Sequence, residues 1–121
     1  MTDPYGLTSY QARTRGSLLL DAARERVVEA ASRVTDQMNR YQLVELSSNR
    51  AVFSARMNWK TWGLRITLLF TQDDSGRTTI DALSEPRLGT TLFDYGQGKK
   101  DLHRILNFIG QEVKKPRKSQ V

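Results

Sequence analysis

The glycine-rich segment Gly96–Lys100 could bind an anion through its backbone. It reads Gly-Gln-Gly-Lys-Lys and stands directly before a predicted helix. Because the free N–H groups and the dipole of a helix N-terminus attract negative charge, a phosphate group is a candidate ligand. The segment is not a Walker loop, since Phe93 replaces the glycine that this motif requires, and it lacks the third glycine of a dinucleotide fingerprint. We therefore favour an ordinary helix start and expect no nucleotide cofactor.

Aromatic rings, cations and one acid are expected to gather at one end of a predicted sheet. Residues 64–71 and 77–83 form a predicted hairpin, so the start of the first strand and the end of the second lie side by side. The chain segments that flank these two strand ends therefore meet. They supply Trp59, Lys60, Trp62, Arg87, Asp94, Tyr95 and Lys99, which we name the aromatic cluster.

Two interpretations of the aromatic cluster are open. It could form a small ligand pocket or docking face. Alternatively, Trp62 or Tyr95 closes the open end of the core, and Asp94 caps the last helix or accepts the indole N–H of Trp62. We favour the structural interpretation, because a buried tryptophan normally needs such a hydrogen-bond partner.

Side chains suited to catalysis or metal binding are scarce in this sequence. It has no cysteine and a single histidine, so zinc sites built on these residues are not expected. His103 is predicted to face solvent, beside the apolar stripe of the last helix, and no nucleophile motif accompanies it. The pair Asp73–Asp74 supplies too few ligands for Ca²⁺ and reads as part of a turn. We expect no enzymatic activity, no metal and no cofactor.

The positive charge of the chain is concentrated at its C-terminal end. The net charge is +6, and residues 114–121 carry four basic residues and no acid, which leaves +2 on the rest. Such a tail could contact nucleic acid or anionic lipid, although four charges give only weak, salt-sensitive binding. We favour a solvated end that complements the negative pole of the last helix. The basic residues are Lys114, Lys115, Arg117 and Lys118.

Hydrophobic periodicity predicts five strands and two helices. Apolar residues recur at helical spacing over residues 22–38, after a candidate N-cap at Asp21, and again over residues 99–115. Alternating patterns and one short apolar run predict strands at residues 17–20, 41–47, 51–57, 64–71 and 77–83. The expected fold is α+β, a two-layer, five-strand antiparallel sheet with helices on one face, in the order β-α-β-β-β-β-α. We expect a loose N-terminal arm over residues 1–15, one domain over 16–115 and a basic tail over 116–121.

Two short motifs resemble those of a group of small uncharacterised bacterial α+β proteins. Thr61-Trp62-Gly63 opens a predicted strand, and Asp94-Tyr95-Gly96 opens the last helix. The group carries a Ser-Trp-Gly-Glu-like strand start and an Asp-Trp-Gly-Lys-Asn-like helix start. Here Leu64 replaces the glutamate, and Gln97-Gly98 replaces Lys-Asn. The resemblance spans about Gly16 to Val113 and implies a fold but no activity.

The element order is also similar to two known folds. One is the fold of the TATA-box-binding protein, and the other is a shortened helix-grip fold of the Bet v 1 and START-like lipid-binding proteins. The second resemblance implies a small apolar ligand held between the sheet and the last helix. A chain of 121 residues leaves little room for a cavity of several hundred Å³.

Three functions are therefore open, and the first is favoured. It is a non-enzymatic binding or interaction module. We favour a homo-oligomer, because the second sheet face is not fully polar and leaves apolar surface to bury. The second is a helix-grip-like carrier of a small apolar ligand, and the third is weak nucleic-acid binding through the tail. Without a signal peptide or a membrane span, cytoplasm is the expected location. The apolar residues expected on the second face are Val44, Leu46, Val52, Leu69 and Leu83.

Overall fold

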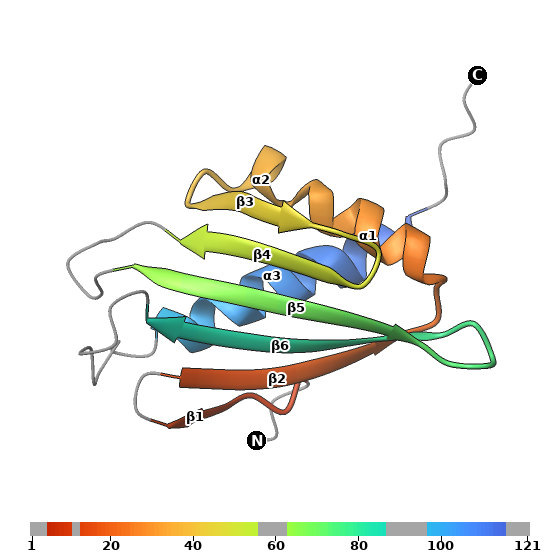
Figure 1. Cartoon of the computed structure of the whole chain (residues 1–121), viewed down its shortest axis with the longest axis horizontal. Helices are drawn as coiled ribbons and strands as arrows, with labels where there is room; N and C mark the ends of the chain where they lie inside the picture. Colours follow the sequence, from red (N-terminus) through yellow and green to blue (C-terminus); the bar gives the residue numbers. More distant parts are fainter. Residues whose placement is uncertain (1–4, 11–12, 56–62, 87–96, 116–121) are drawn as a thin grey trace.

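The computed structural model describes residues 5–10, 13–55, 63–86 and 97–115. These form an α+β fold in which one antiparallel sheet is covered on one face by helices, as the sequence predicts (Figure 1). None of the helices among these residues is both long and apolar enough to cross a membrane. In chain order the elements are β1 (Thr8–Tyr10), β2 (Arg13–Leu20), α1 (Arg24–Ser32), α2 (Val34–Gln37), β3 (Tyr41–Leu46), β4 (Arg50–Ala55), β5 (Leu64–Gln72), β6 (Thr78–Pro86) and α3 (Gln97–Lys114).

The strand order of the sheet is β1-β2-β6-β5-β4-β3, and all neighbouring pairs are antiparallel. Strands β3 to β6 follow one another through short connections, so each pairs with the next. The remaining edge of β6 pairs with β2, which precedes α1 and α2 in the chain. The five predicted strands are all present, and β1 adds a short sixth strand at the edge beside β2.

The N-terminal segment differs from the loose arm that the sequence suggests. It contains β1 and the first residues of β2, and the side chain of Leu7 belongs to the hydrophobic core. The backbone N–H of Ser17 donates to the carbonyl oxygen of Tyr5 at 2.9 Å, which holds the segment against β2. Gly16 makes this packing possible, because a Cβ atom there would overlap the Leu7 side chain.

The first helical region is divided and starts later than its sequence indicates. Asp21 does not cap α1, whose N-cap is Ala23 and has no side-chain hydrogen bond. The expected single helix over residues 22–38 is broken at Arg33, where α1 ends and α2 begins. The backbone N–H of Arg33 bonds to the carbonyl oxygen of Ala30, three residues back, so the chain tightens at the break.

The core lies between the sheet and the helices. Alternate residues of each strand point toward the helices, and the predicted apolar stripe of α3 packs on them. The largest buried apolar side chains, each fully excluded from solvent, are Phe53, Leu64, Ile66, Leu68, Ile80, Leu102, Ile105, Leu106, Ile109, Val27 and Val34.

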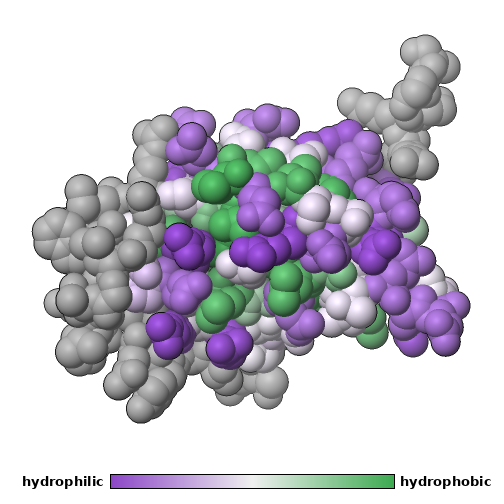
Figure 2. All heavy atoms as spheres, in the orientation of Figure 1, coloured by the Kyte–Doolittle hydropathy of each residue, from purple (hydrophilic) through white to green (hydrophobic). Residues whose placement is uncertain are grey.

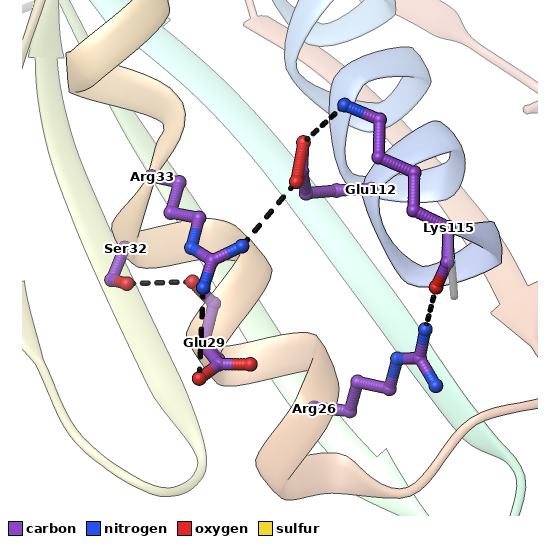
Figure 3. A network of polar contacts seen from close by, with 6 residues as sticks. All are labelled: Arg26, Glu29, Ser32, Arg33, Glu112 and Lys115. Carbon is purple, nitrogen blue, oxygen red and sulfur yellow. Dashed lines mark hydrogen bonds and ion pairs between the residues drawn. The ribbon is translucent and has the colours of Figure 1, made fainter. Parts of the chain in front are cut away.

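A polar network joins α1 to the C-terminal end of α3 (Figure 3). Arg33 lies 3.4 Å from a Glu112 carboxylate oxygen, and Lys115 lies 3.4 Å from the other oxygen of the same group. Arg26 donates to the carbonyl oxygen of Lys115. One of the predicted tail cations is therefore engaged by the protein itself. Lys114 is exposed at the end of α3, while Arg117 and Lys118 lie outside the described residues, so nucleic-acid binding by the tail stays a prediction.

The turn between β5 and β6 has the chemistry that its sequence predicts. The Asp73 carboxylate accepts hydrogen bonds from the Ser75 hydroxyl at 2.7 Å, the Ser75 N–H at 2.9 Å and the Arg77 N–H at 3.0 Å. Gly76 adopts a φ of +85°, which a residue without a side chain tolerates best. The hydrogen bonds from Ser75 and Arg77 lower the pKa of Asp73 below its ordinary value of 3.8.

The lowered pKa of Asp73 makes a prediction about acid stability. A depressed pKa stabilises the fold above the unfolded value of 3.8, and this contribution is lost as pH falls through the folded pKa. We expect Asp73→Asn to unfold at a lower temperature than the parent protein at pH 7, with the gap closing below about pH 4. Thermal unfolding followed by circular dichroism between pH 2 and 7 measures it, with Asp74→Asn as the control. A gap that stays constant down to pH 2 would show that the charge has no role.

Candidate functional site

Buried polar residues gather at the end of the sheet where α3 begins. Five polar side chains are buried among the described residues, and all but Thr78, at the other end of β6, lie near the start of β2, near the end of β6 or in the first turns of α3. Figure 1 shows α3 beginning beside the end of β6, and α3 packs against both β2 and β6. We call this region the polar end. It consists of Thr14, Arg40, Tyr41, Ser84, Gln97 and Asp101.

Asp101 is the centre of the polar end and is completely buried. Its two carboxylate oxygens accept from Arg40 Nε and Nη2, each at 2.9 Å. The hydroxyl of Tyr41 donates at 2.6 Å and Nε2 of Gln97 at 3.0 Å. A buried carboxylate is costly unless it is paired and fully hydrogen-bonded, and here both conditions are met. The cluster therefore ties the start of β3 to the start of α3.

The local sequence explains how these groups converge. Arg40 and Tyr41 stand where the chain enters β3, with the Tyr41 side chain on the helix-facing side of the sheet. Gln97 and Asp101 are four residues apart, so they lie on the same face of α3. Asp101 is 61 positions from Arg40 and 60 positions from Tyr41 in the chain, so no local sequence pattern specifies these contacts.

The electrostatics of the cluster favour a fixed ion pair. Burial alone lowers the pKa of Arg40, but its hydrogen bond to Asp101 and the attraction of that carboxylate together raise it. Burial, the charge of Asp101 and the hydrogen bond to it raise the pKa of the Tyr41 hydroxyl well above its ordinary value of 10.0. Both groups therefore remain protonated donors to Asp101 near neutral pH.

Ser84 differs from Thr78, the other buried hydroxyl residue of β6. The residue is completely buried, and its Oγ has no hydrogen-bond partner within the described part of the chain. Thr14 and Ile66 are its cross-strand neighbours on β2 and β5, and alternation places it on the helix-facing side with Ala82. Thr78, equally buried at the other end of β6, donates to the Ala22 carbonyl at 2.7 Å. An unpaired buried hydroxyl costs about 1–3 kcal/mol, so Ser84 marks a place where a polar atom could bind.

The residues of the aromatic cluster fall mostly outside the described residues. This applies to Trp59, Lys60, Trp62, Arg87, Asp94 and Tyr95, and the interpretation of the cluster stays a prediction. The strand ends that flank it do lie side by side as expected, because Leu64 pairs with Pro86. Lys99 is exposed on α3.

The predicted anion-binding segment is only partly described. Gln97 and Gly98 are buried, and the Gln97 side chain is committed to Asp101, while Lys99 and Lys100 are exposed. Phosphate binding there also stays a prediction. His103 is exposed as expected, and its ring meets that of Tyr5 edge to face, with the centroids 5.3 Å apart.

Sequence reasoning missed the polar end, although one signal was available. Asp101 precedes Ile105 and Ile109 at steps of four, so it stands on the buried stripe of α3. An acid at such a position needs a partner elsewhere in the fold. Ser84 offers a weaker signal, as a polar residue in phase with the inward-facing Ile80 and Ala82.

No protein-family model matches the sequence, and no curated protein matches it. Solved structures do resemble the fold. An uncharacterised protein from Bacillus thuringiensis superposes with a TM-score of 0.57 at 8% identity, over 84% of this chain and 98% of that one. The Bet v 1 protein Ara h 8.0201 gives a TM-score of 0.50 at 8% identity, over 84% and 96%. The two-domain aromatase/cyclase StfQ of the steffimycin biosynthetic pathway gives 0.53 at 10% identity, over 84% and 50%.

The fold is helix-grip-like. Its signature is the first long strand, β2, paired with the last, β6, and a long C-terminal helix lying across the inner face of the sheet. This confirms the helix-grip resemblance that the element order suggests. The comparisons do not test the similarity to the TATA-box-binding protein. The Trp-Gly and Asp-Tyr-Gly motifs lie almost entirely outside the described residues.

Proposed function

We propose that this protein binds a small, mainly apolar molecule at the polar end, between the sheet and the start of α3. The observation that carries the proposal is the unpaired, fully buried hydroxyl of Ser84. The helix-grip-like fold supports it, because its solved relatives include a Bet v 1 protein and a polyketide cyclase. Of the three functions that the sequence leaves open, we therefore place the carrier of a small apolar ligand first.

The surroundings of Ser84 suit a ligand with one polar atom. Its cross-strand neighbour Ile66 is fully buried and apolar, and so are Leu102 and Ile105 on α3, the helix that packs against β6. Burying about 200 Å² of apolar ligand surface contributes about 5 kcal/mol, which supplies most of a modest affinity. The hydrogen bond to Ser84 would then fix the orientation of the ligand and would contribute less to its affinity.

Binding without catalysis is part of this proposal. The acid at the polar end, Asp101, is completely buried and already accepts hydrogen bonds from Arg40, Tyr41 and Gln97. The raised pKa of Tyr41 opposes its use as a base near neutral pH. The other two residues of the polar end, Thr14 and Ser84, carry hydroxyl groups, and a hydroxyl needs a neighbouring base to act as a nucleophile.

Ser84→Ala tests the proposed ligand contact. The variant should fold with equal or greater stability, because it removes an unpaired buried hydroxyl. The affinity for a ligand that contacts the hydroxyl should fall about three- to tenfold, the range for one neutral hydrogen bond. The probe is 1-anilinonaphthalene-8-sulfonate, an apolar fluorophore with one polar group, titrated into the folded protein.

Ser54→Ala is the matched control, since Ser54 lies on β4, two strands away from β6, and on the opposite face of the sheet. It should leave the affinity for the fluorophore unchanged. Equal affinity of the parent protein and both variants would argue against a ligand contact at Ser84.

A further inference from the structure

The face of the sheet opposite the helices carries an exposed apolar patch. Figure 2 views this face and shows apolar surface at its centre with hydrophilic residues around and across it. Leu69 on β5 is 46% exposed and Leu19 on β2 is 53% exposed, although both belong to long, well-paired strands. Leu83 and Val52 lie on the same face, since both pair with Thr67, although Val52 is only 5% exposed. We call this surface the open face.

The open face differs in three positions from the set that the sequence suggests. Leu46 pairs with the core residue Ala51, so it stands in the helix-facing row at the sheet edge. Val44 is the extra residue of a β-bulge between Leu43 and Glu45. Leu19 was not expected there.

We propose that two copies of this chain pair through their open faces, related by a two-fold axis that runs along β5. Such an axis exchanges β4 with β6 and β3 with β2, while each residue keeps its position along the strands. The proposal follows from the register of the sheet, in which one cross-strand row reads Glu45, Val52, Thr67, Leu83, Arg15. The next row reads Arg50, Leu69, Asp81, Ser17.

These rows are complementary to themselves under that axis. Glu45 meets Arg15 of the second copy, and Arg50 meets Asp81 of the second copy. Apolar residues also meet: Val52 faces Leu83, and Leu69 on the axis faces its own counterpart. Because the same contacts occur twice in a two-fold pair, four opposite-charge contacts surround a central apolar strip. Arg65, two residues before Thr67 on β5, also lies on this axis and faces its own counterpart, and its cross-strand neighbour Glu85 places one acid of each copy beside that pair.

The size of the open face predicts a weak dimer. Five strands about 4.8 Å apart and about eight residues long give a face of about 600 Å² per copy. Two such faces bury about 1,200 Å², which is the lower end for a specific interface. Two sheets that pack face to face lie about 10 Å apart, with their strand directions about 30° from each other. This spacing leaves room for the arginine side chains between them. We expect a dissociation constant in the micromolar range, of the order of 10 μM.

A charge exchange tests this arrangement by sedimentation velocity at protein concentrations from 1 to 500 μM. Arg50→Asp and Asp81→Arg each place like charges together, so each should raise the dimer dissociation constant at least tenfold. The double variant Arg50→Asp/Asp81→Arg restores opposite charges across the interface and should recover most of the parent affinity. Both positions of the test, Arg50 and Asp81, carry exposed side chains on a formed sheet, and circular dichroism checks that each variant folds.

Lys99→Asp and Asp74→Arg are the matched controls, because they reverse the same charges on α3 and on the β5–β6 turn. They should leave the dissociation constant within twofold. A monomer at 500 μM would overturn the proposal, as would a dimer that the single variants leave intact. A double variant no tighter than the single ones would overturn the axis along β5. Binding of a different macromolecule to the open face would also overturn the proposed pairing, since the pairing requires a second copy of this chain.

Discussion

Replacing Asp101 with alanine is expected to cost about 3–5 kcal/mol of folding free energy, the range for breaking a buried ion pair. Removing the carboxylate leaves Arg40, Tyr41 and Gln97 without their common acceptor, and the Arg40 side chain is only 17% exposed. A domain of this size has about 5–15 kcal/mol of total stability, so a large fraction of it depends on one side chain. Urea unfolding followed by circular dichroism measures the loss.

Two further variants separate charge from packing at this position. Asp101→Asn keeps an acceptor oxygen but removes the negative charge, so it should fall between the parent protein and Asp101→Ala. Asp74→Ala removes an exposed acid from the β5–β6 turn and should change stability by no more than about 0.5 kcal/mol. If Asp101→Ala costs no more than Asp74→Ala, the cluster does not anchor α3 to β3.

Ile105→Ala is expected to cost about 2–5 kcal/mol, as large-to-small changes in a packed core do. Ile105 is fully buried at the middle of the α3 stripe, where the helix meets the sheet. Loss of its side chain removes apolar contact and leaves a cavity that neighbouring residues close only in part. Urea unfolding gives the free energy, and amide hydrogen exchange should show reduced protection along α3.

Leu69→Ala is the matched control, since Leu69 is a large aliphatic residue of the same sheet but lies on the open face. Measured at a concentration where the protein is monomeric, it should cost clearly less than Ile105→Ala. Equal losses from both substitutions would contradict the assignment of the helix-facing side as the core.

The fold was predictable where the physical signal is local. Period-two alternation through Leu64, Ile66 and Leu68 predicts both the strand and its buried face, and the structure confirms each. The turn at Asp73 and Gly76 was recognisable from side-chain chemistry alone. The helix-grip-like order followed from counting such elements, because short connections leave few ways to pair consecutive strands.

The features that escaped prediction depend on contacts between distant parts of the chain. Strand β1 has only three residues and forms because β2 offers it an edge. The helical periodicity continues through Val34 and Met38, so it gives no sign of the break at Arg33. Arg40 and Asp101 are 61 residues apart, so their pairing becomes visible only when β3 and α3 are in place.

The sequence predicts which strand ends meet, but it does not predict the residues of the polar end. The hairpin argument correctly brings the start of β5 beside the end of β6. The polar end lies at this same end of the sheet, yet its residues were not singled out beforehand. Serine is common in strands, and only the burial of Ser84 and its missing partner distinguish it from other hydroxyls.

Native mass spectrometry of the protein, purified gently from its own cells, tests the proposed ligand site most directly. The account predicts that the parent protein retains a small molecule, that Ser84→Ala retains less of it, and that Ser54→Ala retains the parent amount. A parent protein that carries only its own mass, together with fluorophore binding that Ser84→Ala leaves unchanged, would contradict the account.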